Sequence, residues 1–235
     1  MGALYLVGTP IGNLEDITLR ALRVLREVDL IAAEDTRTTQ KLLRHYDIAT
    51  RLTSFHDFTG PRKLRRLIDF LREADVALVS EAGMPAISDP GFPLVRAAVD
   101  AGFRVVPIPG PSAIVAALAA SGLPTHSFLY LGFLPRKPGP RRRLLAARVT
   151  EPATLVAFES PHRLLATLED VLIVLGDRPI AVARELTKVH EEFLRGRVSD
   201  ILDHFHATPP RGEFTLVIGG YERVRESEEQ VDHEA

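Results

Sequence analysis

The stretch Ser80-Glu-Ala-Gly-Met-Pro-Ala-Ile-Ser-Asp-Pro-Gly91 decides the fold, because it is a Gly/Pro-rich loop placed directly after the apolar run Val76–Val79. Such a run is typical of a buried strand, and the glycines and prolines mark its end. Two similar loops follow apolar runs: Gly8-Thr-Pro-Ile-Gly-Asn13 follows Ala3–Val7, and Pro109-Gly-Pro-Ser-Ala113 follows Val105–Ile108. A single loop of this kind is explained by a tight turn. Three loops after strands of one sheet predict a ligand site, because open parallel sheets bind ligands at the carboxyl ends of their strands.

Strand-like and helix-like segments alternate around these loops. Further strands are expected at Leu30–Ala33 and Leu52–Phe55, and helical spacing of apolar residues runs through Leu19–Val28, Leu64–Leu71, Leu94–Ala101 and Pro111–Ala120, with another helix reaching Leu42 and Leu43. Strands that alternate with helices indicate a parallel sheet covered on both faces.

The pattern changes after Ser121-Gly-Leu-Pro124. Strands are expected at Phe128–Gly132, Leu155–Phe158, Ile180–Ala183 and Phe214–Ile218, with helices at Arg141–Arg148, Arg163–Leu175 and Val198–Phe205. Fewer helices per strand predict a mixed sheet. We therefore divide the chain into an N-terminal α/β domain (residues 1–120), a C-terminal α/β domain (121–221) and an acidic tail (222–235) expected to be disordered.

Composition excludes several classes of protein. The 235 residues include no cysteine, which rules out a disulfide framework, a thiolate metal site and a cysteine nucleophile. The start of the chain lacks a basic segment before its first strand, and no apolar run reaches the ~20 residues that span a bilayer. We expect a cytoplasmic protein without a membrane segment or a metal. The loops match neither the phosphate-loop pattern nor G-x-G-x-x-G, which disfavours nucleoside triphosphates and NAD.

Positive charge is clustered although the formal net charge is −2. One cluster comprises Arg62, Lys63, Arg65 and Arg66, and the other comprises Arg136, Lys137, Arg141, Arg142, Arg143 and Arg148. Two interpretations stay open: a solvated surface, or a surface that binds nucleic acid.

Eight ordered motifs carry a resemblance to a known family. They are Gly8–Asn13, Ala33-Glu-Asp-Thr-Arg37, Ser80–Gly91, Pro109–Ala113, Gly132-Phe-Leu-Pro135, Glu159-Ser-Pro-His-Arg163, Ala183-Arg-Glu-Leu-Thr-Lys188 and Gly212-Glu-Phe-Thr215. Together, from Leu4 to about Gly219, they resemble the small-subunit ribosomal RNA methyltransferase I family of the tetrapyrrole methylase superfamily. The resemblance implies a two-domain class III methyltransferase fold, S-adenosyl-L-methionine as methyl donor, and 2′-O-methylation of a cytidine in the decoding centre of 16S rRNA within the 30S subunit. It also implies a homodimer and no metal.

The long loop departs from the family at two positions. The family usually has Asp-Ala-Gly-Thr-Pro there, whereas this chain has Glu81 and Met84 at the first and fourth positions. Glu81 keeps the carboxylate with a longer reach, and Met84 removes a hydroxyl. Given the resemblance, we expect the donor to be bound by Pro10, Glu81, Gly83, Met84, Ile87, Ser88, Asp89, Ser112, Ala113, Phe133, Leu186 and Thr215.

A ribose hydroxyl is a poor nucleophile, so a nearby base would assist the reaction. The candidate catalytic residues are Asp35, Glu159, Glu185 and Lys188, with Glu34 and His162 also at predicted strand ends. Structural alternatives stay open: an ion pair of Asp35 with Arg37 that caps a helix, and a pairing of Glu185 with Lys188.

Three further arginines, Arg20, Arg37 and Arg163, are candidate phosphate contacts, because guanidinium binds phosphate in a bidentate fork. Together with Arg136, Lys137, Arg141, Arg142 and Arg143 they form the expected RNA-binding set. Two other functions remain open: a methyltransferase of the same fold acting on a tetrapyrrole or other small molecule, and a non-catalytic RNA-binding or assembly factor.

Overall fold

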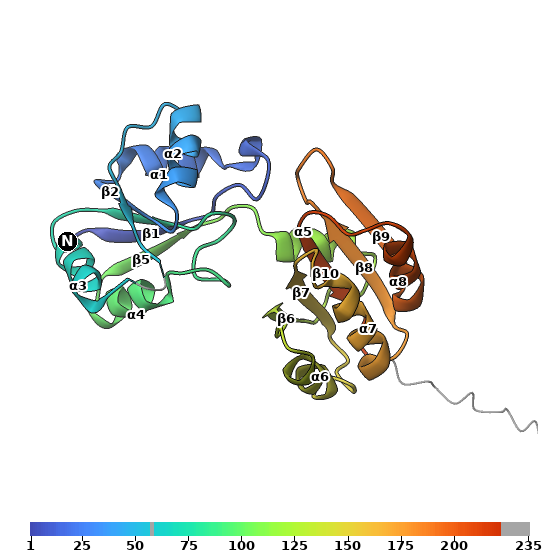
Figure 1. Cartoon of the computed structure of the whole chain (residues 1–235). Coiled ribbons are helices and arrows are strands. Elements are labelled where there is room, and N and C mark those ends of the chain that lie inside the picture. The colour runs from blue at the N-terminus through green and yellow to red at the C-terminus, as the bar shows by residue number, and fades with distance from the viewer. Residues whose placement is uncertain (57–58, 222–235) are drawn as a thin grey trace, which may run out of the picture.

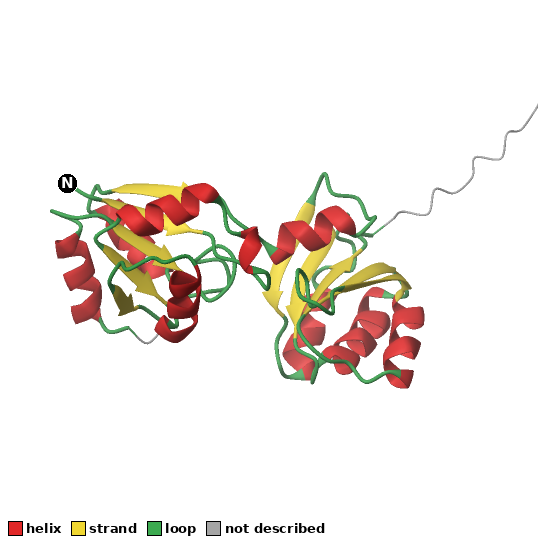
Figure 2. Ribbon diagram, turned by 90° about the horizontal axis from the view of Figure 1, so that it is seen from above, coloured by secondary structure: helices red, strands yellow, loops and turns green. Residues whose placement is uncertain are grey.

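The computed structural model describes residues 1–56 and 59–221, which form two five-stranded sheets. Figures 1 and 2 show two lobes, each with strands in its centre and helices around them. The first sheet is parallel and the second is mixed, so the predicted α/β fold class is confirmed. The acidic tail predicted at residues 222–235 lies outside the described residues.

The first sheet has the strand order β3-β2-β4-β1-β5, and all of its pairs are parallel. Its strands are β1 (Ala3–Val7), β2 (Leu30–Ala33), β3 (Leu52–Ser54), β4 (Val76–Val79) and β5 (Arg104–Ile108). Because β1 lies between β4 and β5, the loops that follow these three strands meet at one edge of the sheet.

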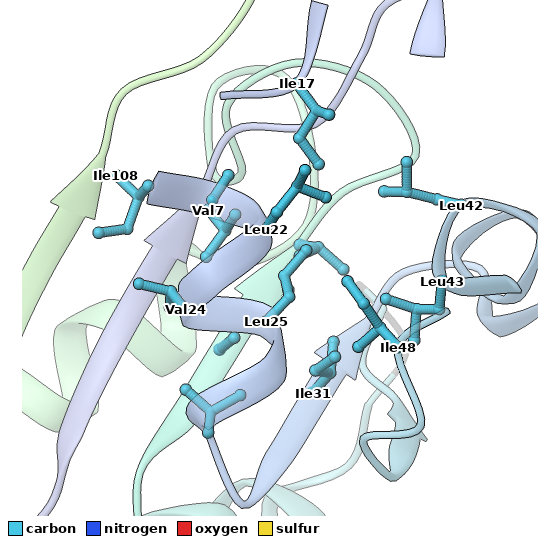
Figure 3. Close-up of a cluster of buried hydrophobic side chains, with 14 of the residues drawn as sticks. Val7, Ile17, Leu22, Val24, Leu25, Ile31, Leu42, Leu43, Ile48 and Ile108 are labelled. Carbon is cyan, nitrogen blue, oxygen red and sulfur yellow. The ribbon is translucent and has the colours of Figure 1, made fainter. Parts of the chain in front are cut away.

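Helices cover both faces of this sheet. They are α1 (Leu19–Glu27), α2 (Thr36–His45), α3 (Pro61–Phe70) and α4 (Phe92–Asp100), with a short 3-10 turn η1 (Leu14–Asp16) before α1. Figure 3 shows the core under α1 and α2, where Leu25 and Leu43 pack against Ile31 of β2 and all three are fully buried. A second core lies under α3 and α4. Burial of each large aliphatic side chain contributes roughly 1.5–3 kcal/mol, which fixes the sheet that carries the three loops.

The second sheet has the order β6-β7-β10-β8-β9, in which only β6 and β7 are parallel. Its elements are β6 (Phe128–Phe133), α6 (Pro138–Ala146), β7 (Thr154–Glu159), α7 (Leu164–Leu175), β8 (Pro179–Arg184), β9 (Glu192–Arg197), α8 (Val198–Ala207) and β10 (Phe214–Ile218). The sequence did not predict β9, since its residues Glu-Phe-Leu-Arg-Gly-Arg form a polar edge strand without the apolar run of a buried one.

Helix α5 (Ala113–Ala120) packs against the second sheet. We placed it in the N-terminal domain, but its Ala117 and Leu118 pack against Val156 of β7 and Val217 of β10 in the second sheet. The chain therefore crosses from the first sheet to the second before α5 begins (Figure 1). The helix is apolar on nearly all sides, so its pattern did not indicate which sheet it covers.

None of the helices in the described part of the chain is long and apolar enough to cross a membrane.

Candidate functional site

Three loops interlock at the carboxyl edge of the first sheet. Thr9 and Gly83 exchange two backbone hydrogen bonds of 2.9 and 3.0 Å, which join the loop after β1 to the loop after β4. The Thr9 hydroxyl also donates to the Ser80 carbonyl oxygen at 3.3 Å. Gly8 lies against Gly110 of the loop after β5, so that a Cβ on either residue would approach the Cα of the other to 2.8 Å. The contact therefore requires glycine on both sides.

A cavity of about 620 Å³ opens between these loops and the second sheet. Its wall comprises Ile11, Glu34, Glu81, Ala82, Gly83, Met84, Ile87, Ser88, Asp89, Ser112, Ala113, Ile114, Phe133, Phe158, Glu159, Ser160, Pro161, Ala183, Leu186, Glu213, Phe214 and Thr215. All the residues predicted to bind the donor line it except Pro10. Its mostly apolar wall with a few carboxylates suits an organic molecule that has hydroxyl groups, and its size is that of a small-molecule site.

The second domain contributes the part of the wall that the sequence did not reveal. Strand β10 runs antiparallel to both β7 and β8, so its start lies beside their ends. Glu213 and Phe214 thereby join Phe158 in the wall. Thr215 was the residue predicted from this strand, and its neighbours Glu213 and Phe214 were missed. The motif Gly212–Thr215 was the available signal.

Backbone in the left-handed region occurs on both sides of the cavity. Ala86 and Ser88 have φ values of 69° and 61° in the loop after β4, and Glu185 and Thr187 have φ values of 48° and 66° after β8. Residues other than glycine rarely adopt this region, and such residues cluster at ligand sites where the surrounding structure holds them.

Asp35 and Glu159, two of the four candidate catalytic residues, have structural partners. The Asp35 carboxylate accepts from the backbone N–H of Arg37 at 2.6 Å and caps α2, so the cap of the structural alternative is confirmed and is made through the Arg37 backbone. Glu159 lines the cavity but is 2% exposed. It accepts hydrogen bonds from the Thr167 hydroxyl at 2.7 Å and from the Arg163 guanidinium at 2.9 Å. Both carboxylates therefore form hydrogen bonds that stabilise the fold.

Glu185 and Lys188 form the ion pair that was the alternative to a catalytic role. Lys188 Nζ donates to Glu185 at 2.9 Å and to Glu213 at 2.8 Å. Burial by itself would raise the pKa of Glu185, but hydrogen bonds from Lys188 and from the backbone of Glu213 outweigh it and the pKa is lowered. Burial would likewise lower the pKa of Lys188, and the bonds to Glu213 and Glu185 raise it instead. Lys188 is thus protonated at neutral pH and has no lone pair to accept a proton.

The basic segment of the second domain is divided between surface and core. Arg136, Lys137 and Arg143 are exposed. Arg141 is a correction: we predicted an RNA contact, but the residue is 2% exposed and pairs with the buried carboxylate of Asp170 at 2.6 Å. Arg142, half-exposed, binds the other oxygen of the same carboxylate at 2.6 Å. Arg141 lies on the side of helix α6 that faces Asp170 on α7, and it is therefore buried and not available at the surface.

The other predicted phosphate contacts lie apart from one another. Arg163 donates to Glu159 and, at 2.6 Å, to the Leu134 carbonyl oxygen, so it is a structural residue in this fold. Arg20 lines a separate pocket of about 230 Å³ with Arg104. Arg37 is exposed in the first turn of α2. Within residues 1–56 and 59–221, no three His, Cys, Asp or Glu side chains are grouped as metal ligands would be.

Comparison with known proteins places the chain among methyltransferases. The family model "Tetrapyrrole (Corrin/Porphyrin) Methylases" matches residues 3–202. A protein of Thermotoga maritima named ribosomal RNA small subunit methyltransferase I is 52% identical over 223 residues, which cover 94% of this chain and 100% of that protein. A protein of the same name from Halalkalibacterium halodurans is 54% identical over 229 residues, covering 97% of this chain and 79% of its own length.

Solved structures share the fold. Uroporphyrin-III-C-methyltransferase from Thermus thermophilus is 26% identical with a TM-score of 0.60, and the match covers 92% of this chain and 94% of that one. The cobalt precorrin-4 methyltransferase CbiF is 21% identical with a TM-score of 0.68, over 92% of this chain and 94% of that one.

Proposed function

Because the chain belongs to the tetrapyrrole methylase family, we propose that it transfers a methyl group from S-adenosyl-L-methionine to ribosomal RNA. The proposal rests on the cavity between the two domains. The Gly/Pro loops of the first sheet and side chains of the second sheet enclose its volume of about 620 Å³. The name shared by relatives about half identical to this chain supports RNA as the acceptor.

The residues present fit the donor. The contact between Gly8 and Gly110 brings the loops after β1 and β5 together without side chains in between. The carboxylates of Glu81 and Asp89 suit the ribose hydroxyls, and the backbone of 83–87 suits the methionine half. Phe133, Leu186 and Thr215 from the second domain complete the pocket. When bound, the donor supplies a methyl group already activated on a sulfonium. The role left to the chain is to position the partners and to exclude water.

We propose that the acceptor is the 2′-hydroxyl of a cytidine in the decoding centre of 16S rRNA, presented by the 30S subunit to a homodimer. Arg136 follows Phe133 by three residues, so its Cα lies within about 11 Å of that of Phe133, at 3.8 Å per residue. The exposed Arg136 and Lys137 thus place positive charge near the cavity, where it suits RNA phosphates, and the exposed Arg143 adds positive charge on α6.

The test has two stages. Titration of the purified protein with S-adenosyl-L-methionine by calorimetry measures donor binding, and labelled donor is then offered with 30S subunits, naked 16S rRNA and a tetrapyrrole. We expect label on 30S subunits, since RNA is often recognised by its shape. Mapping of the labelled nucleotide then tests the cytidine 2′-O assignment.

Each other outcome contradicts part of the proposal. Label only on the tetrapyrrole would indicate the small-molecule alternative. RNA binding without donor binding would indicate a non-catalytic assembly factor. A monomer in sedimentation equilibrium at assay concentration would overturn the homodimer.

A further inference from the structure

A hydrogen bond between two side chains joins the two domains beside the cavity. The hydroxyl groups of Ser88 and Tyr130 lie 2.7 Å apart. Ser88 belongs to the loop after β4 and lines the cavity, whereas Tyr130 lies within β6 of the second sheet and was not among the residues predicted from the sequence. The bond therefore spans the cleft.

The loop that carries Ser88 needs an external contact to keep its shape. Ala86 and Ser88 both have positive φ, at 69° and 61°, and two such residues so close together persist only where surrounding structure holds them. On the opposite domain, Gly132 lies so close that a Cβ there would be 3.4 Å from Ser88 Oγ. Tyr130 and Gly132 thus form the surface against which the turn at Ser88 rests.

Tyr130 is itself held in place by the cavity wall. Its ring meets the edge of Phe158 at a centroid distance of 5.4 Å, and Phe158 contacts Phe133 at 5.5 Å. Phe158 and Phe133 both line the cavity. Burial raises the pKa of Tyr130, the bond to Ser88 opposes this, and the charge of Asp89 adds to the rise. The phenol therefore keeps its proton across the neutral range.

We propose that Tyr130 is a positioning residue for the methyl donor: through Ser88 it holds the loop that places Ile87 and Asp89 in the cavity wall. This inference rests on the proposed function, because it names the residue that prepares the same site. Tyr130 does not line the cavity, and it acts through Ser88.

Tyr130→Phe tests the proposal, because it removes the hydroxyl and leaves the ring packing. We expect the dissociation constant for S-adenosyl-L-methionine to rise about 3- to 10-fold, the range of one net hydrogen bond, with a higher KM for the donor and a smaller effect on kcat. The matched control is Tyr46→Phe, which removes a hydroxyl that donates to the Leu14 carbonyl oxygen at 2.7 Å within the first domain. Its donor affinity should stay within twofold of the parent protein.

A double-mutant cycle distinguishes the bond from general destabilisation. If Tyr130 acts through Ser88, Ser88→Ala and Tyr130→Phe together weaken donor binding no more than Ser88→Ala alone. Effects that add, or an unchanged affinity in Tyr130→Phe, would overturn the proposal.

Hydrogen exchange separates this inference from the proposed function. In the ligand-free protein, Tyr130→Phe should accelerate amide exchange in residues 86–91 several-fold while leaving the helices of both domains unchanged. If the parent protein fails to bind the donor but this acceleration appears, the proposed function fails and the contact still positions the loop. Unchanged exchange in that segment would refute the positioning role.

Discussion

The two domains that supply the walls of the cavity are held together by different contacts. In the first domain the loops are joined by backbone hydrogen bonds and by the contact of Gly8 with Gly110. In the second domain buried or half-buried charges fasten the elements, with Asp170 between Arg141 and Arg142, and Glu159 beside Arg163. Close approach of backbone shapes a surface for a ligand, whereas buried ion pairs fix one helix to the next. We therefore expect changes at the loop contacts of the first domain to alter donor binding, and changes at the buried ion pairs of the second domain to alter stability.

The largest effect is expected for Asp170→Ala. The change leaves Arg141 in the core without its carboxylate, and loss of one member of a buried pair costs about 3–5 kcal/mol of the free energy of unfolding. Urea unfolding measures this loss of stability. The control is Asp100→Ala, whose exposed pair with Arg96 should contribute less than about 1 kcal/mol to the free energy of unfolding. A tenfold loss of donor affinity in folded Asp170→Ala would contradict the expectation that this ion pair affects stability and not donor binding.

Gly110→Ala should have the next largest effect and should act on the donor. The new Cβ would meet the Cα of Gly8 at 2.8 Å, so two of the loops must separate. We expect donor affinity to fall about 10- to 100-fold, with a loss of about 1–3 kcal/mol in stability from overpacking. Calorimetric titration gives the first quantity and urea unfolding the second. Gly139→Ala is the matched control, because its Cβ would have no neighbour within 4 Å. Equal donor affinities in the two variants would argue against the glycine contact.

The same contrast explains what the sequence could predict. Glycine and proline after apolar runs indicated the first wall, because each loop is marked locally by its own glycines and prolines after a strand, although the contacts among the loops are long-range. In the second domain, whether a charged residue is buried or exposed depends on partners far away in the sequence. Arg141 and Arg143 are two positions apart on α6, and only the contact with Asp170, 29 residues away, decides which of them is buried. Tyr130 carried no local signal, because its partner Ser88 belongs to the other domain.

A smaller effect is expected on the surface of the second domain. Replacing the exposed Arg143 by alanine should weaken RNA binding by about 1 kcal/mol and reduce the salt dependence of the affinity by about one ion, as for one lost phosphate contact. Donor binding should not change. Binding isotherms at several salt concentrations measure both quantities. Arg96→Ala on α4, which removes an arginine already paired with Asp100, is the control. An unchanged salt slope for Arg143→Ala would remove Arg143 from the proposed RNA surface.

The smallest effect concerns pH and the pair of Glu185 with Lys188. Because the pKa of Glu185 is lowered in the folded protein, its contribution to stability is present above the unfolded value of about 4.3 and is lost as the pH falls through the lowered folded value. The raised pKa of Lys188 adds a contribution that is lost only above about pH 10.4. The free energy of unfolding of the parent protein minus that of Glu185→Gln should therefore be constant between pH 6 and 9, about 1 kcal/mol or less, and shrink below pH 4. Urea unfolding at pH 7 and pH 3 measures it, and a difference that grows in acid would show that this part of the second wall is not held by charge.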